Sequence, residues 1–181
     1  MEFQTKRLYI RPICLEDKSD VFEYRSQVDT YKYLSLIPND VSDIEKFINQ
    51  TSPDFNIPGT WFQFVILLND NQRLIGDIGL HFLNTSEENK QVELGYTLNP
   101  DFQGKGFANE ALTEIIDYLF KVLSKHRITA SIDPENTSSI NLIEKLGFRK
   151  EAHFKKSLFF HGEWVDDLVY ALLSEEWKRS N

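Results

Sequence analysis

The segment Gln103-Gly104-Lys105-Gly106-Phe107-Ala108 constrains the fold of this chain more than any other stretch. It follows an apolar, strand-like run over 92–98 and opens a long amphipathic pattern typical of a helix. Because glycines lack a Cβ atom, the backbone at 104 and 106 can approach a ligand closely, and the unpaired N–H groups of a first helical turn favour negative charge. The segment therefore predicts a strand-to-helix turn that can hold a diphosphate.

Two common glycine-rich motifs fit this segment badly. A Walker A loop requires Ser or Thr after Gly-Lys, where this chain has Gly106, and a dinucleotide fingerprint requires a third small residue where this chain has Asn109. A nucleotide-binding module is therefore a weak interpretation. It would predict ATP or NAD binding that CoA cannot displace.

Together with the preceding Glu93-Leu94-Gly95-Tyr96-Thr97-Leu98-Asn99-Pro100, the segment resembles the acetyl-CoA signature of the GNAT acyltransferase superfamily. The chain is similar to the RimJ/RimL-like branch, the ribosomal-protein N-terminal acetyltransferases. The similarity extends to Thr5-Lys6-Arg7-Leu8-Tyr9-Ile10-Arg11-Pro12 and to Gly162, Trp164 and Asp166, so it covers essentially the whole chain. It implies an α+β fold with a mostly antiparallel central sheet, one splayed parallel strand pair and helices on both faces.

Composition limits the remaining function classes. A length of 181 residues with 41% hydrophobic content suits one domain over 1–181. The net charge of −8 disfavours nonspecific nucleic-acid binding and favours a cationic partner. No apolar run is long enough for a membrane helix and the N-terminus lacks a signal-peptide pattern, so we expect a cytoplasmic protein without membrane contact. Cys14 is the single cysteine, so we expect no internal disulfide. The histidines lack metal-ligand spacing, so we expect no metal site.

Hydrophobic periodicity predicts the order of the elements. We expect a loop over 51–59 that could form a flap over a substrate site, and a cap at Ser42 for the second helix. The strand, helix, strand, helix order after residue 91 implies one parallel pair in an otherwise antiparallel sheet. The predicted strands are 8–12, 61–68, 74–83, 91–98, 127–133, 154–160 and 164–173, and the predicted helices are 16–27, 43–50, 107–123 and 136–146.

The resemblance also implies a set of contacts with acetyl-CoA. Backbone groups around Tyr96, Thr97 and Leu98 would contact the pantetheine arm, with the Leu98 N–H as a candidate oxyanion donor. A second family segment contains Asn136, Ser139 and Asn141. Asn136 is equally suited to capping the helix and to contacting the cofactor. The cofactor-binding candidates are Tyr96, Thr97, Leu98, Gln103, Gly104, Lys105, Gly106, Phe107, Ala108, Asn136, Ser139 and Asn141.

The implied reaction is direct attack of a primary amine on the acetyl thioester, without a metal or a covalent enzyme intermediate. Glu93 is the candidate base, directly or through a water, against the alternative of a solvated or ion-paired strand residue. Ser139 is the candidate acid toward the leaving sulfur. Many superfamily members carry a tyrosine on this helix, but this chain has none over 136–148. His81 could line the acceptor pocket or be a partly buried structural histidine.

The sequence does not identify the acceptor amine. A protein N-terminus, a polyamine, an aminoglycoside and an amino-acid-like metabolite are all candidates, since kinship at the level of the fold does not choose among them. The rival function is a non-catalytic acyl-CoA-binding or sensor protein of the same fold. The sequence also leaves open the acyl-chain preference and the oligomeric state, for which a homodimer is one candidate.

Overall fold

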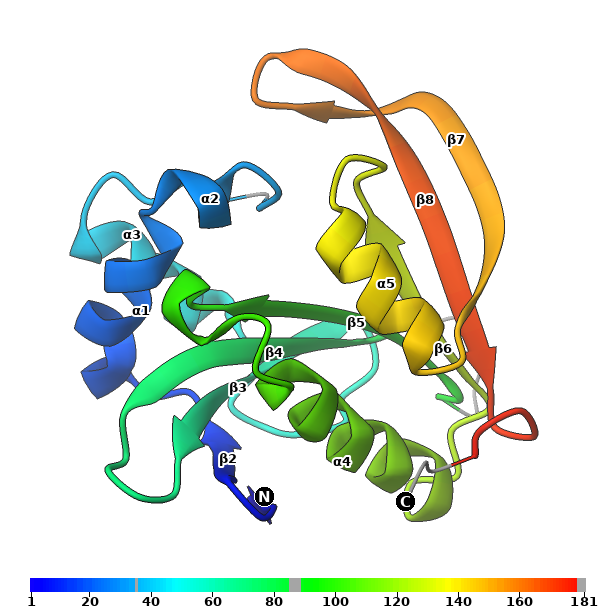
Figure 1. Ribbon diagram of the computed structural model, residues 1–181, viewed down its shortest axis with the longest axis horizontal. Coiled ribbons are helices and arrows are strands. Elements are labelled where there is room, and N and C mark those ends of the chain that lie inside the picture. Colours follow the sequence, from blue (N-terminus) through cyan, green and yellow to red (C-terminus); the bar gives the residue numbers. More distant parts are fainter. Residues whose placement is uncertain (35, 85–88, 179–181) are drawn as a thin grey trace.

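The computed structural model describes residues 1–34, 36–84 and 89–178. Its central feature is a twisted sheet with the strand order β1-β2-β3-β4-β5-β6-β8-β7 (Figure 1). Neighbouring strands are antiparallel except β5 and β6, which are parallel, so the expected sheet topology is confirmed. The strands are β1 Phe3–Gln4, β2 Leu8–Pro12, β3 Thr60–Leu68, β4 Leu74–Phe82, β5 Gln91–Leu98, β6 Arg127–Ile132, β7 Arg149–Phe160 and β8 Glu163–Leu173.

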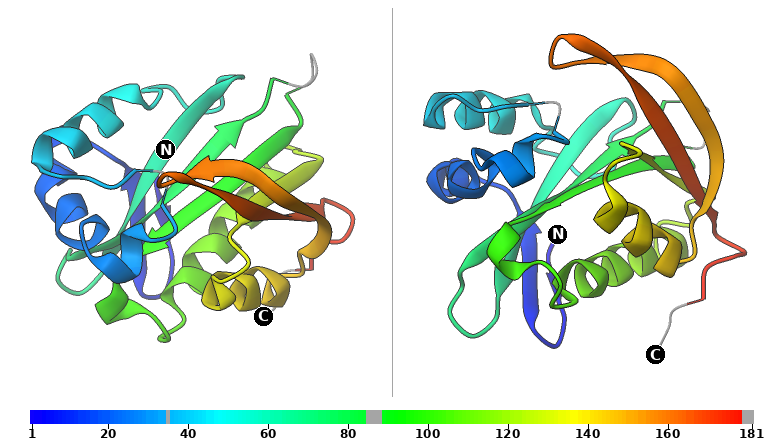
Figure 2. Two further views of the ribbon diagram at one scale, coloured as in Figure 1. Left: turned by 90° about the horizontal axis from the view of Figure 1, so that it is seen from above. Right: turned by 45° about the horizontal axis from the view of Figure 1, so that its top comes forward.

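Helices cover both faces of the sheet, as the family resemblance implies (Figures 1 and 2). On one face, buried side chains of α4 and α5 such as Leu112 and Ile143 join the main hydrophobic core. On the other face, Val21 of α1 and Ile44 of α3 pack with Val65 of β3 in a second, smaller core. The helices are α1 Lys18–Arg25, α2 Val28–Tyr31, α3 Val41–Gln50, α4 Phe107–Lys121 and α5 Thr137–Lys145, with 3-10 helices η1 Leu15–Asp17 and η2 Pro100–Phe102. No helix in the described ranges is long and apolar enough to cross a bilayer.

Strand β5 has two chemically different faces because successive side chains alternate across a sheet. Val92, Leu94 and Leu98 belong to the main core and therefore face α4 and α5. Glu93 and Gly95 face the opposite side, which α1 and α3 partly cover. The two sides of this strand can therefore serve different parts of a reaction.

The parallel pairing between β5 and β6 is short. It joins 91–93 to 127–129, after which β5 continues along β4 to Leu98 while β6 continues along β8 to Ile132. The second half of β5 therefore has an edge without a strand partner. This is the splayed pair that the resemblance implies.

Several local predictions need correction. Ser42 is not the cap of α3, because the side chain of Asp40 accepts a hydrogen bond from the Ser42 N–H at 2.8 Å and the helix begins at Val41. The predicted helix over 16–27 is divided into η1 and α1, and the extended backbone at Gln27 separates α1 from α2. Strand β7 begins five residues earlier than predicted, since its nearly fully exposed side chains give no alternating pattern to detect.

The loop over 51–59 is confirmed as a loop, and its Phe55 side chain packs on the α4 side of the sheet. Its Phe55 ring packs edge-on against Phe62 and Phe82, with centroid separations of 5.1 Å in both cases. Those two rings belong to the main core on the α4 side. Burial of the Phe55 ring thus anchors this part of the loop on the α4 side of the sheet. Thr51, Ser52 and Pro53 instead line a cavity with Gln63 of β3. A flap over a substrate site stays a prediction.

Candidate functional site

The glycine-rich loop has the conformation expected of a phosphate-binding turn. Gly104 and Gly106 have φ values of 72° and 81°, in the left-handed region that side chains rarely adopt. Gly106 is the N-cap of α4 and offers no side chain to cap it, so the N–H groups of the first turn are free of a side-chain cap. A Cβ atom on Gly104 would meet nothing within 4 Å. The loop therefore presents open backbone donors at the positive end of a helix dipole, which fits a diphosphate.

Other members of this segment support the loop from inside. The Gln103 side-chain amide donates to the Leu98 carbonyl at 3.0 Å, and Lys105 Nζ donates to the Asp101 carbonyl at 2.7 Å. Phe107 and Ala108 are half-buried and pack on the main core. Gln103 is one of the predicted cofactor contacts, but its amide nitrogen is hydrogen-bonded to the end of β5.

Backbone directions at the end of β5 follow from two hydrogen bonds. The Asn99 N–H donates to the Ile75 carbonyl toward β4, whereas the Leu98 carbonyl accepts from Gln103 on the other side. The backbone N–H and C=O groups of successive residues in a strand point to alternate sides. Those of Tyr96 and Leu98 therefore point into the space between β5 and β6, and those of Thr97 point toward β4. Leu98 and Tyr96 are thus placed at the gap, while the buried Thr97 is not.

The α5 segment meets β5 through two hydroxyl groups. Asn136 is the N-cap of α5, and its side-chain oxygen accepts from the Ser139 N–H at 3.1 Å, which confirms its capping role. Ser139 Oγ lies 2.7 Å from the Tyr96 hydroxyl. Burial raises the pKa of Tyr96 to about 12, so the phenol keeps its proton at neutral pH. Asn141, further along α5, is exposed.

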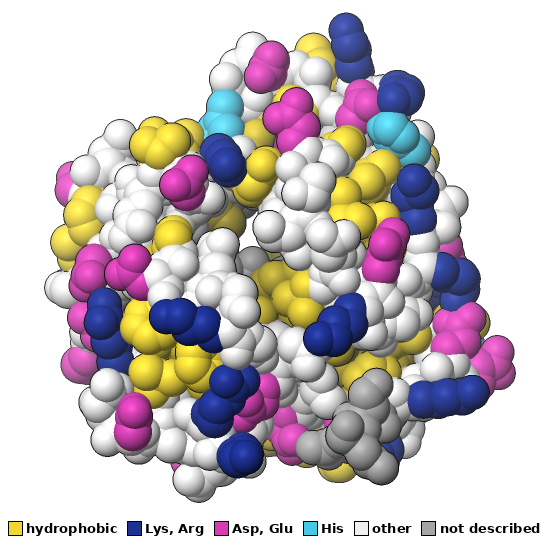
Figure 3. Space-filling model, viewed as in Figure 1, with side chains coloured by type: hydrophobic (Ala, Val, Ile, Leu, Met, Phe, Trp, Pro, Cys, Tyr) yellow, Lys and Arg dark blue, Asp and Glu magenta, His cyan; other side chains and the backbone are white. Residues whose placement is uncertain are grey.

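Sequence reasoning assigned Tyr96 a backbone role and missed its side chain. The α5 segment has no tyrosine, and the phenol that contacts Ser139 comes from Tyr96 of β5, on the face that carries Val92, Leu94 and Leu98. Strand alternation indicated this face, but nothing in the sequence indicated where α5 would lie against it. Figure 3 shows a hollow with hydrophobic side chains on its floor between the glycine loop and α5.

On the opposite face, Glu93 stands in a row of cross-strand neighbours. Its side chain is one-third exposed, and its Oε2 lies 3.5 Å from His81 Nδ1. His81 in turn stacks on Trp61, with ring centroids 4.9 Å apart and planes 13° from parallel. A Cβ atom on Gly95, the next residue of β5 on this face, would meet nothing within 4 Å. Glu93 therefore borders open space in which an acceptor could stand.

A buried charged cluster fixes α1 close to this row. Asp77 is 1% exposed and accepts from Arg25 Nη2 at 2.6 Å and from Gln63 Nε2 at 2.6 Å, with a further hydrogen bond from the Tyr24 hydroxyl. Arg25 also lies over the ring of Phe47 on α3. Since every member is buried, the cluster is a structural connection between α1 and the sheet, and not a reactive site.

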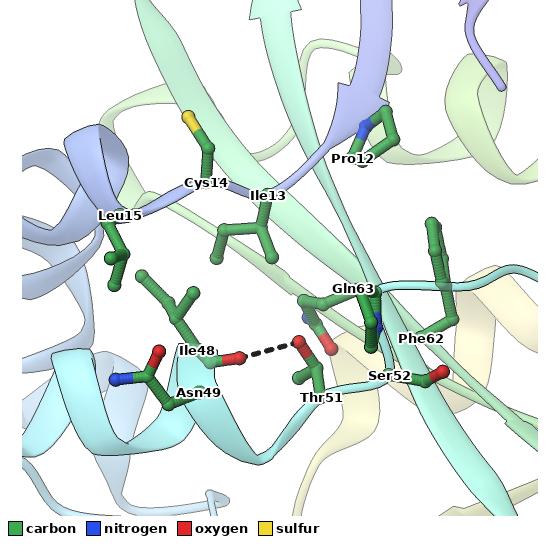
Figure 4. Close-up of a pocket in the computed structure, with 11 residues that line it drawn as sticks. Pro12, Ile13, Cys14, Leu15, Ile48, Asn49, Thr51, Ser52, Phe62 and Gln63 are labelled. Atoms are coloured by element: carbon green, nitrogen blue, oxygen red, sulfur yellow. Dashed lines mark hydrogen bonds between the residues drawn. The ribbon is translucent and has the colours of Figure 1, made fainter.

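Two further features adjoin the site. The Tyr33 hydroxyl donates to the Glu135 carbonyl at 3.2 Å and so joins the segment after α2 to the turn before α5. A cavity of about 330 Å³ lies between the end of β2, the end of α3 and β3, with Gln63 and Cys14 in its wall (Figure 4). Among the described residues, no three His, Cys, Asp or Glu side chains gather closely enough to hold a metal ion.

Comparison with protein families gives one clear match. Residues 7–149 match the family model described as an acetyltransferase (GNAT) domain. The matched range contains the glycine loop, Glu93, Tyr96 and Ser139.

Similar proteins agree with this match. The chain is 37% identical over 177 residues to YnaD of Bacillus subtilis, an uncharacterized N-acetyltransferase, which covers 98% of this chain and 99% of that protein. It is 34% identical over 125 residues to the [ribosomal protein uS5]-alanine N-acetyltransferase of Escherichia coli, covering 68% of this chain and 63% of that enzyme. A solved structure of Mycobacterium smegmatis RimJ in complex with CoA-disulfide is similar with a TM-score of 0.82 and 25% identity, covering 96% of this chain and 85% of that one.

Proposed function

Because this chain belongs to the GNAT acetyltransferase family and is an N-acetyltransferase, we propose that it transfers an acetyl group from acetyl-CoA to a primary amine. Within that class, an N-terminal α-amine of a protein is the leading acceptor. The uS5-alanine N-acetyltransferase, which is similar to two-thirds of this chain, supports that choice. We further propose that the protein belongs to the RimJ/RimL-like branch and works in the cytoplasm.

The observation that carries the proposal is that the candidate base and the candidate acid lie on opposite faces of β5. Glu93 lies on the face toward α1 and α3, and the Tyr96–Ser139 pair lies on the face toward α4 and α5. Between them, the β5 edge beyond Glu93 has no strand partner. A proton acceptor and proton donors thus stand on opposite sides of an open strand edge, as direct transfer between two substrates requires.

The donor site fits acetyl-CoA on features of this chain. The uncapped start of α4 with its two left-handed glycines can hold the diphosphate, and the edge of β5 can bind an extended arm through the backbone groups of Tyr96 and Leu98. When bound, acetyl-CoA supplies an activated acetyl thioester. The Leu98 N–H, which points into the gap, can stabilise negative charge on the acyl oxygen.

Proton movements involve both faces. A side-chain amine with a pKa near 10 is almost fully charged at neutral pH, whereas an α-amine, at about 8, needs less help. Glu93 accepts the amine proton directly or through a water, and His81 lies close enough to orient its carboxylate. On the other face, Ser139 donates a proton toward the departing sulfur, with the Tyr96 hydroxyl as its hydrogen-bond partner.

The decisive experiment measures release of CoA thiol from acetyl-CoA with a panel of N-terminal peptides, polyamines, aminoglycosides and amino acids. The expected result is turnover with one class and a mass gain of one acetyl group on that acceptor. Peptides with a blocked N-terminus serve as the control for the α-amine. Tight CoA binding without product from any amine would instead support the acyl-CoA-binding or sensor alternative, and light scattering on the same samples would test the homodimer.

A further inference from the structure

Arg7 lies beside the glycine loop although it belongs to the turn between β1 and β2. Its Nε donates to Glu110 Oε2 at 2.6 Å, and its Nη1 donates to the Lys105 carbonyl at 3.0 Å. Its third nitrogen, Nη2, has no hydrogen-bond partner in the described part of the chain. That nitrogen lies 3.5 Å from the position that a Cβ atom on Gly106 would occupy.

The guanidinium is held in place on several sides. Glu110 also accepts from Thr5 Oγ1 at 2.6 Å and from the Arg7 N–H at 2.9 Å, so its carboxylate is fixed relative to the β1–β2 turn. The ring of Phe107 lies under the guanidinium, 4.3 Å from its carbon. A planar fork fixed by an ion pair, a carbonyl and an aromatic face loses little conformational freedom when it binds a ligand.

The free nitrogen and the start of α4 converge on the same space. Gly106 caps the helix without a side chain, so the first-turn N–H groups and Arg7 Nη2 are open donors around one residue. The chain as a whole carries a net charge of −8, so an anion bound here would depend on these local donors and not on the general surface charge. One oxygen of a diphosphate can accept from Nη2 while another accepts from the first-turn N–H groups, and an anionic acceptor strengthens both hydrogen bonds.

We propose that Arg7 is a cofactor-recognition residue, which holds the loop through the Lys105 carbonyl and donates from Nη2 to the diphosphate of the acyl donor. The inference rests on the proposed function, because it takes acetyl-CoA as that donor. It assigns to the start of the chain, 98 residues away from Lys105, a part in the donor site.

The test compares binding of CoA and of dephospho-CoA by calorimetry, since the second ligand keeps the diphosphate but lacks the 3′-phosphate. Arg7→Met is expected to weaken both ligands to a similar extent, by about 10- to 100-fold, as for loss of a charge-assisted hydrogen bond. Its kcat/KM with S-acetylpantetheine, which has no diphosphate, should stay at the wild-type value. Arg7→Lys keeps the charge but cannot make both anchoring bonds, so its loss should be intermediate.

Arg149→Met is the matched control. Arg149 is 43% exposed against 41% for Arg7 and is likewise ion-paired, with Glu151 and Glu176, but it lies on β7 away from the loop. Its CoA affinity should equal that of wild type. The ligand-free melting temperatures of both variants show whether either substitution disturbs the fold.

Three outcomes would overturn the inference. These are unchanged CoA affinity in Arg7→Met, an equal loss with S-acetylpantetheine, and a loss confined to CoA that spares dephospho-CoA. Absence of CoA binding in the wild-type protein is a different result. It would overturn the proposed donor and the role of Arg7 together, whereas normal wild-type binding with an unaffected variant would refute Arg7 alone.

Discussion

The hydroxyl oxygens of Tyr96 and Ser139 lie 2.7 Å apart although the two residues are separated by 43 positions in the chain. One comes from β5 and the other from the first turn of α5, whose position the Asn136 cap fixes. A serine hydroxyl alone is a weak acid, and the phenol gives it a partner with which it can share a proton. The pair therefore brings a phenol to α5, a helix that has no tyrosine of its own.

Tyr96→Phe removes the phenol oxygen and keeps the ring. We expect it to lower kcat by about tenfold or more, as Ser139→Ala should, while the CoA dissociation constant changes little, because proton donation matters in the transition state. The double variant should lose little more than the worse single one if the hydroxyls act as a unit. Unchanged kcat in Ser139→Ala would remove the acid role, and losses confined to CoA affinity would make the pair a binding element.

Glu93→Gln keeps the size of the side chain but cannot accept a proton. The loss in kcat/KM should be greatest near pH 6.5 and should shrink as pH rises past about 8, where an α-amine loses its proton unaided. A pH–rate profile of both proteins with one peptide acceptor measures this. An equal loss at all pH values would indicate a structural role for the carboxylate instead.

Gly95→Ala tests whether the space beside Glu93 receives the acceptor. The added methyl group meets no atom within 4 Å, so melting temperature and CoA affinity should be preserved while kcat/KM for the amine falls. Gly79→Ala is the contrasting control on the neighbouring strand. Its Cβ would lie 2.8 Å from Gln63 Oε1, so we expect that variant to lose stability. Normal acceptor kinetics in Gly95→Ala would move the acceptor site elsewhere.

Arg25→Met should lower the free energy of unfolding by about 3–5 kcal/mol, because it leaves Asp77 as a buried carboxylate without its cation. Urea denaturation measures the change. Lys18→Met is the control, since the Lys18–Glu45 ion pair is exposed by 38% and 44% and should contribute less than about 1 kcal/mol. Similar losses in the two variants would contradict the structural role of the cluster.

Lys125 should make the free energy of unfolding depend on pH in the alkaline range. It is 3% exposed and donates to the Asn56 side chain, and burial, with Lys90 nearby, lowers its pKa to about 8. Between about pH 8 and 10 the unfolded chain binds this proton and the folded protein does not, so the contribution of Lys125 to stability increases with pH over this window. The stability difference between wild type and Lys125→Met, measured in urea at pH 7 to 10, should shift in favour of wild type by at most about 3 kcal/mol. A constant difference would show that Lys125 titrates normally.

Much of the fold follows from local signals. The helix start at 106–107 was predictable from two glycines ahead of an amphipathic run, and Gly147, with a φ of 91°, ends α5 as its position indicated. The parallel pair followed from the order of strands and helices. Element boundaries were less predictable where local signals compete: Asp40 caps α3 in place of Ser42, and Phe55 turns a polar-looking loop into part of the core.

The sequence by itself determined the family, the glycine loop and the alternation of side chains that places Glu93 and Tyr96 on opposite faces of β5. Each of these features depends only on residues that are close together in the chain. Only the tertiary structure decided which distant groups meet: Ser139 with Tyr96, Arg7 with the Lys105 carbonyl, and Arg25 with Asp77, 52 residues apart. The physical reason is that side-chain periodicity specifies which way a residue faces, whereas its partner depends on how helices and strands pack across the whole core.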